Sequence, residues 1–282
     1  MNSEKNLYYV CWYMTYYCNL ECEYCYAFKN KINNPLDTLV SVGSELINQG
    51  IKKINLTGGE PFASKHLLEI IDTFHSKIDL SITTNGTIGT KEQLIYIKGK
   101  LERITISIDS VDAELGKLLR SKKCDTHKIL QFASDAIELG FKVKINTVVS
   151  KMNKMHLRNI GNWLMQFPES ISWKLFQITD NPNVESSING YLISNLEFEN
   201  IVLDMAKQFP MLKIQKASSE DLNHNYIIVT PEGGVQVPYL LGYKPIGNVL
   251  QDNIYELLEQ NNYSFELNKS EFNKKSIQAL SI

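Results

Sequence analysis

The sequence has no long apolar run and almost no net charge. No stretch approaches about 18 consecutive apolar residues, which excludes a helix that spans a bilayer. The 29 Lys and Arg residues against 31 Asp and Glu residues give a formal charge of −2, so no basic excess indicates binding to polymeric nucleic acid or to a membrane surface. The first residues also lack the basic and then apolar layout of a secretory signal. We therefore expect a cytoplasmic protein with neither of these partners.

Cysteines are few and unevenly placed. Only five occur, and three of them have the spacing Cys18-x3-Cys22-x2-Cys25. An odd number of cysteines in a chain without a signal peptide argues against a disulfide framework and for thiolate chemistry. Zinc is one alternative, but structural zinc usually takes four ligands, often as two pairs, and no second pair follows here. Three thiolates suit an iron–sulfur cube with one iron free of protein ligands, an open metal position where a small molecule can bind.

Apolar, β-branched segments alternate with helical patterns along the first 180 residues. We expect strands over 8–12, 51–56, 80–83, 104–108, 143–149 and 171–178, and helices over 36–47, 66–75, 128–139 and 157–165. Crossovers of this length imply a parallel sheet. Six units are too few for a complete eightfold barrel, so the sequence predicts an α/β fold with a partial (βα)6 TIM-like barrel.

The most distinctive motifs follow the expected strands. The cysteines come after the first strand, Thr-Gly-Gly-Glu-Pro at 57–61 after the second, Thr-Asn-Gly at 84–86 after the third, and Asp-Ser at 109–110 after the fourth. Barrels of this type carry their chemistry at the carboxyl ends of the strands. We therefore expect these motifs to form one site.

The pattern changes after residue 180. A helix is expected over 197–208, a β-hairpin from 226–230 and 235–237, and a short helix over 254–258. We predict a core over 1–180, a small α+β extension over 181–260, and a polar tail over 261–282.

The cysteine spacing with Tyr24, followed by Gly-Gly-Glu-Pro, strongly resembles the radical S-adenosylmethionine (SAM) superfamily over roughly residues 7–180. The Asn85-Gly86 turn and the strand end at 107–109 strengthen the resemblance. It implies a [4Fe–4S] cluster whose free iron is chelated by SAM. An electron splits SAM into methionine and a 5′-deoxyadenosyl radical, which abstracts hydrogen from a substrate. The resemblance also implies an electron donor such as flavodoxin or ferredoxin.

The motifs assign roles to individual residues. By resemblance, Cys18, Cys22 and Cys25 are cluster ligands. The two glycines of the Gly-Gly-Glu-Pro motif would let backbone approach the SAM amino group, and its glutamate would pair with the ammonium. The alternative interpretation is that these residues bind no ligand: the glycines form an ordinary turn, and the glutamate lies near a helix start. The full set of SAM-binding candidates is Tyr24 (through its backbone), Gly58, Gly59, Glu60, Pro61, Asn85, Ser107, Arg120 and Asn146.

Two further cysteines have alternative interpretations. Cys11 is expected as a small buried strand residue, and Cys124 as an exposed loop thiol. Either one is also a candidate donor of a hydrogen atom to a substrate radical.

The extension resembles the SPASM or twitch extensions that follow many radical SAM cores. The resemblance rests on residues 226–237 and on Ile-Gly-Asn at 246–248. Those extensions bind auxiliary clusters through cysteines, but no cysteine follows Cys124. We therefore expect a substrate lid or scaffold without a second cluster.

Residues 142–149 and 173–177 are similar to the viperin group, which dehydrates nucleoside triphosphates to chain-terminating analogues in antiviral defence. Cationic residues suit polyphosphate. This sequence departs from the viperin group in three places. It lacks the Asn and His that viperins have before the cysteine loop, it has Ser172 where an Arg is expected, and its segment at 216–219 differs. The candidate substrate residues are Lys53, Lys144, Lys174, Gln177 and Tyr226.

The wider class with SPASM-like tails largely modifies ribosomally made peptides, and the aromatic residues of segment 8–17 suit packing against a peptide. The sequence therefore predicts a radical SAM enzyme that acts on a ribosomal peptide. A viperin-like nucleotide dehydratase is the alternative, and a non-catalytic metal-binding regulator is an alternative of another class.

Overall fold

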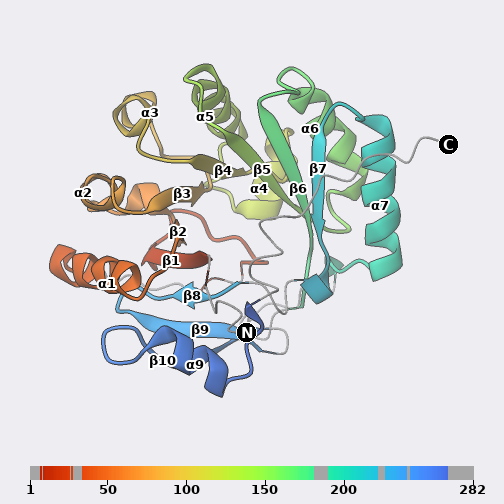
Figure 1. Ribbon diagram of the computed structural model, residues 1–282. Helices are drawn as coiled ribbons and strands as arrows, with labels where there is room; N and C mark the ends of the chain where they lie inside the picture. The colour runs from red at the N-terminus through yellow and green to blue at the C-terminus, as the bar shows by residue number, and fades with distance from the viewer. Residues whose placement is uncertain are drawn as a thin grey trace.

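The computed structural model describes residues 7, 9–25, 27, 34–180, 190–221, 226–239 and 242–265. Its centre is one curved sheet in which seven parallel strands follow one another in sequence order (Figure 1). These strands are β1 (Tyr9–Thr15), β2 (Lys53–Gly58), β3 (Asp79–Thr84), β4 (Arg103–Ser107), β5 (Val143–Val149), β6 (Ile171–Gln177) and β7 (Lys213–Ala217).

Three strands from the C-terminal part extend the same sheet beyond β1. Strand β8 (Ile228–Val229) pairs with β1 in parallel, and β9 (Gly234–Tyr239) and β10 (Gly242–Asn248) follow in antiparallel pairing. The sheet order is therefore β10-β9-β8-β1-β2-β3-β4-β5-β6-β7. Because neither edge pairs with the other, the barrel is open.

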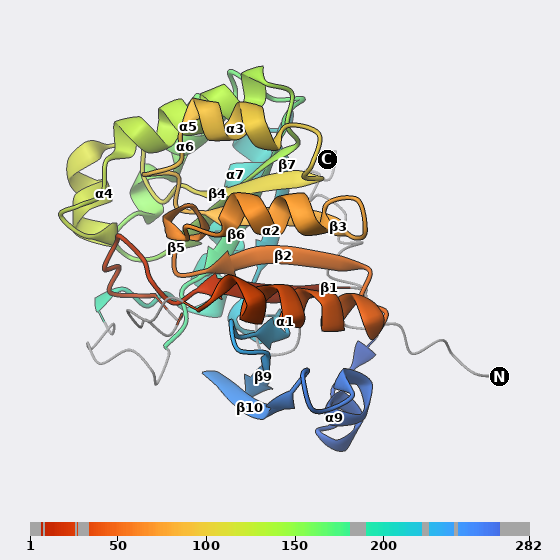
Figure 2. The ribbon, with the colours of Figure 1, turned by 90° about the vertical axis from the view of Figure 1, so that its left-hand side faces the viewer.

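The helices are α1 (Leu36–Asn48), α2 (Leu67–Phe74), α3 (Lys91–Ile97), α4 (Ala113–Arg120), α5 (Thr126–Glu138), α6 (Leu157–Leu164), α7 (Asn195–Gln208) and α9 (Ile254–Gln260), with 3-10 turns η1 (Pro61–Ala63) and η2 (Lys154–His156). Most of them cover the outer face of the sheet, whereas α4 lies at the ends of the strands (Figure 1 and Figure 2).

Strand β5 shows how the sequence separates the two faces of the sheet. Val143, Ile145 and Val149 are buried, whereas Lys144 and Asn146 between them are half-buried. Side chains alternate across a strand, so the apolar set faces the helices and the polar set faces the barrel interior. Polar residues on the inner face are thus available for a site.

Several helices, α3, α4 and α5 among them, begin at a side chain that accepts a hydrogen bond from a free amide group of the first turn. Thr90 and Gln93 form a capping box at α3, Asp112 Oδ1 accepts from Leu115 N (2.8 Å) at α4, and Asp125 caps α5 in the same way. Helices α3 and α4, which have seven and eight residues, were not predicted from the sequence. Their polar caps are the signals that indicate them.

The structure confirms the predicted mixed α/β fold with its parallel sheet. It adds β7, a strand that the sequence did not indicate because its residues are largely polar and it lies at the sheet edge. Pairing is continuous across residue 180, since β7 joins β6 and β8 joins β1. The division into three parts remains a prediction, and residues 266–282 of the predicted tail lie outside the described residues.

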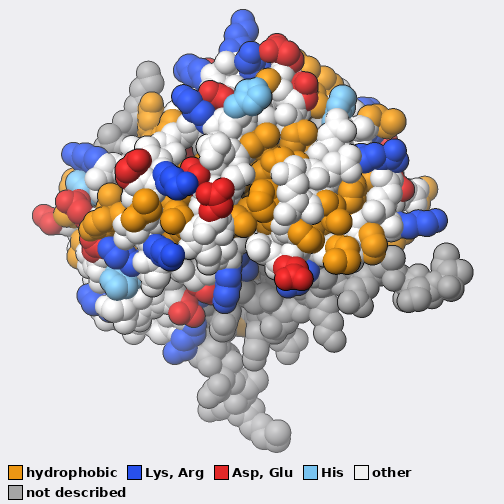
Figure 3. Space-filling model, turned by 90° about the horizontal axis from the view of Figure 1, so that it is seen from above, with side chains coloured by type: hydrophobic (Ala, Val, Ile, Leu, Met, Phe, Trp, Pro, Cys, Tyr) orange, Lys and Arg blue, Asp and Glu red, His pale blue; other side chains and the backbone are white. Residues whose placement is uncertain are grey.

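No helix in the described part of the chain is both long and apolar enough to cross a membrane. Seen from above, basic and acidic side chains are interspersed, and hydrophobic side chains gather on one part of that face (Figure 3). This distribution agrees with the formal charge of −2.

Candidate active site

The three cysteines of the spaced motif lie in the loop that follows β1, at the carboxyl end of the sheet. Figure 2 shows this loop beside α4. Cys22 Sγ donates to Arg120 O at the end of that helix (3.3 Å), and Cys18 Sγ accepts from Leu20 N (3.4 Å). All three thiols are half-buried. Burial raises the pKa of Cys22 to about 11, although the Arg120 charge opposes that rise.

The two glycines of the Gly-Gly-Glu-Pro motif are required by the close approach of this loop. Gly59 N donates to Thr15 O (2.8 Å), and Glu60 N donates to Tyr17 O (2.8 Å). A Cβ atom at Gly59 would lie 2.1 Å from Tyr17 O, and one at Gly58 would lie 2.4 Å from Thr15 O. Gly58 also has φ +120°, which L side chains rarely adopt. The glycines therefore dock the start of the cysteine loop onto the end of β2.

The Glu60 carboxylate is completely buried and joins two strand ends. Its Oε1 accepts from Thr84 Oγ1 (2.6 Å) and Phe62 N (3.0 Å), and its Oε2 accepts from Asn85 N (2.6 Å). Burial raises the pKa of Glu60, and these hydrogen bonds partly oppose the rise. Both carboxylate oxygens thus bind groups of the chain itself. Pairing of this side chain with the SAM ammonium remains a prediction, as does contact of Pro61, the first residue of η1, with SAM.

Asn85 connects the end of β3 to the first cysteine. Its Nδ2 lies 3.8 Å from Cys18 Sγ and donates to Asn19 Oδ1 (2.9 Å). Its Oδ1 accepts from Thr87 N (2.9 Å), and Asn19 Nδ2 donates to Thr87 Oγ1 (2.8 Å). A hydrogen bond to a ligand sulfur is one of the factors that set the potential of an iron–sulfur cluster.

A group formed by Tyr24, Asp109 and Arg120 holds the other half of the loop; Asp109 and Arg120 are buried, and Tyr24 is half-buried. Tyr24 Oη donates to Asp109 Oδ2 (2.6 Å), and Arg120 Nε lies 3.5 Å from the same oxygen. Arg120 Nη1 also donates to Ser107 O (2.6 Å). Burial alone would lower the pKa of Arg120, but Asp109 raises it; burial and Asp109 together raise the pKa of Tyr24 well above its usual range. Asp109 was expected at the site as part of the Asp-Ser motif that follows the fourth strand, but no individual role was predicted for it.

Strand register places several predicted residues in one row on the inner face. Ser107 of β4 is paired with Asn146 of β5, which is paired with Lys174 of β6. Lys174 is 2% exposed, and its Nζ donates to Tyr226 Oη (3.1 Å) and lies over the rings of Phe176 and Tyr226. Lys144 lies on the same face of β5, two residues before Asn146.

A second cluster of buried side chains lines the barrel interior apart from the main core. Tyr9, Cys11, Tyr13 and Ile228 form it, and Tyr226 is among the residues packed against it. Cys11 Sγ donates to Tyr9 Oη (3.5 Å). Burial raises the pKa of Cys11 to about 11, while the positive charge of Lys174 acts in the opposite direction.

The remaining predicted residues lie elsewhere. Lys53 is at the opposite end of β2 from the cysteine loop and pairs with Glu102. Gln177 Nε2 donates to Ile193 O (3.2 Å) and Asn195 Oδ1 (2.9 Å), on the face opposite to Lys174. The structure therefore does not bring these two residues together with the inner row, and their substrate roles remain predictions.

Cys124 lies in a different part of the structure from Cys11. The sequence suggested an exposed loop thiol, but Cys124 is 3% exposed and belongs to the main hydrophobic core. Its exposure was overestimated because the adjacent lysines, Lys122 and Lys123, indicated a solvated segment.

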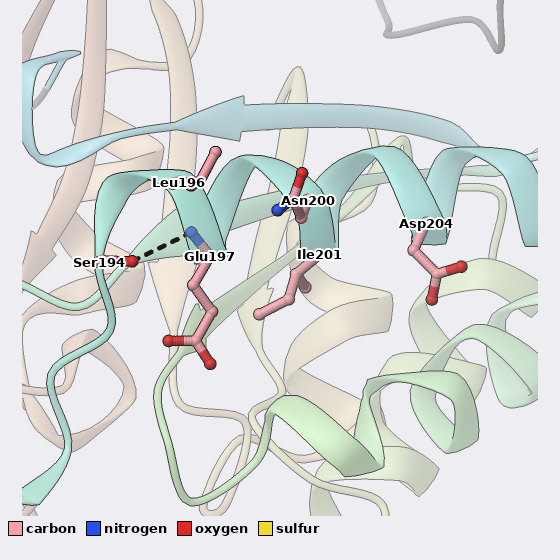
Figure 4. A pocket seen from close by; sticks show the side chains of 6 residues that line it. All are labelled: Ser194, Leu196, Glu197, Asn200, Ile201 and Asp204. Carbon is pink, nitrogen blue, oxygen red and sulfur yellow. Dashed lines mark hydrogen bonds between the residues drawn. The ribbon is translucent and has the colours of Figure 1, made fainter.

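A hollow of about 400 Å³ runs along α7, away from the cysteines (Figure 4). Its lining includes Leu196, Ile201 and Asp204, and Ser194 Oγ accepts from Glu197 N (3.2 Å) at the helix start. Because it contains none of the strand-end residues, it is a groove on the helix surface rather than part of the candidate active site.

Residues 12–164, more than half of the chain, match the Radical SAM superfamily. The S-adenosylmethionine-dependent nucleotide dehydratase of Flammeovirga pacifica is 24% identical over 263 residues, which cover 88% of this chain and 89% of the relative. A GTP 3′,8-cyclase of Helicobacter pylori (strain HPAG1) is 28% identical over 72% of this chain and 64% of the relative. The structure titled native anSMEcpe with bound AdoMet and Cp18Cys peptide superposes with a TM-score of 0.71 at 17% identity, over 93% of this chain and 82% of that one.

The chain therefore belongs to the radical SAM superfamily. The predictions of an enzyme, of a [4Fe–4S] cluster and of SAM as cofactors are thereby confirmed. The SPASM-like character of the extension remains a prediction.

The residues at the carboxyl end of the sheet fit these cofactors. Within the described residues, Asn146 Oδ1 is buried without a hydrogen-bond partner, which suits an atom that awaits a polar ligand. No three His, Cys, Asp or Glu side chains of the described part converge as they would on a single ion. A cube is held at separate corners, one cysteine to each iron, so its ligands need not converge on one point.

Replacement of Gly59 by Ala should prevent normal docking of the cysteine loop. The new Cβ would overlap Tyr17 O, and overpacking of this kind typically costs about 1–3 kcal/mol. We expect severalfold less iron and sulfide per chain after anaerobic reconstitution. Gly190→Ala is the matched control, because nothing lies within 4 Å of its Cβ position. Equal iron content in the two variants would contradict the docking role.

Replacement of Tyr24 by Phe should destabilise the cluster-free protein. It removes a donor from a buried carboxylate, which typically costs about 1–3 kcal/mol of unfolding free energy. Tyr96→Phe is the control, since it removes a hydrogen bond to Asp72 at the surface and should cost about 0.5 kcal/mol or less. Urea unfolding followed by circular dichroism measures both changes. If the two variants lose a similar unfolding free energy, the burial of Asp109 does not matter for the strength of this hydrogen bond.

Proposed function

We propose that this enzyme removes the elements of water from a nucleoside triphosphate in a SAM-dependent reaction. The observation that carries the proposal is the pair of lysines, Lys144 and Lys174, on neighbouring strands of the inner face. Ammonium groups on this face suit the negative charges of a polyphosphate.

The Lys174 ammonium provides a positive charge inside the barrel. The Lys174 side chain is 2% exposed, and its Nζ donates to Tyr226 Oη. Ser172, beside Lys144 in the register, replaces the arginine expected from the viperin group. Phosphate binding in this chain therefore depends on the two lysines.

Tyr226 is the proposed neighbour of the base. Its hydroxyl group accepts from Lys174, and its ring packs against the interior cluster of Tyr9, Cys11 and Tyr13. Aromatic faces next to a cation suit a molecule that has both a planar base and an anionic chain.

The sequence relatives support a nucleotide substrate. The dehydratase of Flammeovirga pacifica aligns over nearly the full length of both chains, and the name of the Helicobacter pylori enzyme also specifies a nucleotide. Modification of a peptide is the second candidate, supported by the peptide held in the structurally similar anSMEcpe and by the tyrosine-rich interior.

Cys18, Cys22 and Cys25 would hold the cluster, and Asn146, Arg120 and the backbone of the Gly-Gly-Glu segment would bind SAM. Bound there, the cofactors supply the radical that removes one hydrogen atom from the substrate. The chain's own residues hold the cysteine loop against the ends of β2, β3 and β4 and keep the substrate on the inner face.

Cys11 is the proposed donor of hydrogen to the substrate radical. Loss of a hydroxyl group as water from such a radical takes up one hydrogen atom, which the Cys11 S–H bond can give. The sulfur radical left behind regains one electron from an external one-electron donor, such as flavodoxin or ferredoxin, and one proton from water. Cys124 is a poorer candidate, because it lies in the main core rather than on the inner face.

The substrate class is tested with the anaerobically reconstituted protein, dithionite, SAM and CTP, UTP, GTP or ATP in separate reactions. We expect 5′-deoxyadenosine together with a nucleotide product lighter by one water, both measured by mass spectrometry. Modification of a peptide with no turnover of any nucleotide would overturn the proposal in favour of the second candidate.

Lys174→Met should raise the KM for the nucleotide at least tenfold, because a charge-assisted contact is worth roughly 1.5–3 kcal/mol. Slow SAM cleavage without nucleotide should be unchanged. Lys128→Met is the control, since this lysine lies exposed on α5. If both variants have the same KM, Lys174 does not bind the substrate.

Cys11→Ala should uncouple the two products. We expect 5′-deoxyadenosine to form, with a severalfold lower ratio of dehydrated nucleotide to deoxyadenosine, whereas Cys124→Ala keeps the ratio of the unmodified enzyme. An unchanged ratio in Cys11→Ala would exclude this thiol as the hydrogen donor.

A further inference from the structure

One carboxylate from the C-terminal hairpin contacts both flanks of the cysteine loop. Glu232 Oε2 accepts from Tyr16 Oη (2.9 Å), and Glu232 Oε1 accepts from Asn34 Nδ2 (3.0 Å). Tyr16 lies two residues before Cys18, and Asn34 lies next to the start of α1. The two ends of the segment that contains the cysteines are thus tied to one side chain.

The hairpin turn that presents Glu232 is itself held firmly. Gly233 has φ +88° and Gly233 N donates to Thr230 O (2.9 Å), while Val249 N donates to Gly233 O (2.8 Å). Asn248 Nδ2 donates to Glu232 O (3.0 Å). Asn248 belongs to the Ile-Gly-Asn motif of the extension, so this motif fixes the backbone of Glu232.

The turn is also anchored to the central sheet. Strand β8, which leads into it, pairs with β1, and β1 leads into the cysteine loop. Figure 2 shows β9 and β10 beneath β1. Glu232 therefore reaches the loop from an element that is registered against the strand from which the loop emerges.

We infer that Glu232 is a positioning residue for the iron–sulfur cluster and that the C-terminal hairpin is a brace for the cysteine loop. This inference rests on the proposed ligation by Cys18, Cys22 and Cys25. It gives the extension a role at the cluster, in addition to the expected role as a lid or scaffold.

The physical basis is the conformational entropy of the loop. Hydrogen bonds from Glu232 to Tyr16 and Asn34 restrict the conformations of both flanks of the loop, so less entropy is lost when its three thiols take up the cluster geometry. A carboxylate suits this task because each of its oxygens accepts a separate hydrogen bond. Asn34 is 8% exposed, so its amide donor has little access to water if Glu232 is removed.

Glu232→Ala tests the inference in the reconstituted full-length protein. We expect the variant to lose iron to a chelator about three- to tenfold faster than the unmodified protein. This factor corresponds to the loss of about one hydrogen bond at each flank of the loop. The electron paramagnetic resonance signal of the reduced cluster should broaden, because the loop then holds the cluster in more than one arrangement. Circular dichroism of the cluster-free variant checks that it remains folded.

Two further variants separate positioning from general stability. Glu232→Gln keeps an oxygen for Asn34 and a side chain of the same size, so it should restore iron retention at least in part. Glu256→Ala removes an exposed carboxylate from α9 in the same extension and should behave as the unmodified protein. Tyr16→Phe combined with Glu232→Ala should release iron no faster than Glu232→Ala alone.

Normal iron retention and an unchanged spectrum in Glu232→Ala would overturn the inference. So would additive effects of Tyr16→Phe and Glu232→Ala, or a Glu232→Gln variant that is as impaired as Glu232→Ala. None of these outcomes concerns the substrate, which is tested by nucleotide turnover in the unmodified enzyme. Failure of the brace and failure of the proposed dehydration are therefore distinguishable.

Discussion

The fixation of one loop against the ends of parallel strands is the constraint on which the rest of this structure depends. A short loop with three thiols has no conformation of its own that suits a cluster. Here the glycines at the end of β2 leave room for the loop backbone, and Glu60 N donates a hydrogen bond to it. The buried Glu60 carboxylate connects the same strand end to β3. Tyr24 and Asp109 add a connection to β4. Cluster chemistry thus depends on the rigidity of the sheet.

The use of Glu60 shows how a motif can have a structural purpose besides a ligand-binding one. Its two oxygens accept three hydrogen bonds from the chain, and its side chain is removed from solvent. A buried carboxylate that is fully hydrogen-bonded connects chain segments stably, whereas burial of the same group without partners would cost free energy of folding. The neighbouring glycines act in the same way, since the space that a side chain would need is filled by loop backbone.

Much of the fold and part of the site could be predicted from the sequence. The apolar and β-branched residues of β5 and β6 indicated strands because one face of each strand packs against the helices. The cysteine spacing with Gly-Gly-Glu-Pro indicated the superfamily. The polar edge strand β7 gave no such signal. The contacts of Asp109 and Glu232 also escaped prediction, because they join residues far apart in sequence and depend on packing that no local pattern encodes. Lys53 was grouped with Lys174 by residue type, but strand direction places it at the other end of β2.

The pairing of β8 with β1 bears on the order in which the molecule is completed during translation. Strand β1 leaves the ribosome well before β8, its neighbour on one side, because Cys11 and its register partner Ile228 lie far apart in the sequence. Until that segment emerges, β1 is an exposed sheet edge, which invites pairing with other chains. Contacts between such distant segments form late, because closing a long loop is entropically costly. Maturation with iron is therefore best suited to the finished polypeptide rather than to the nascent one.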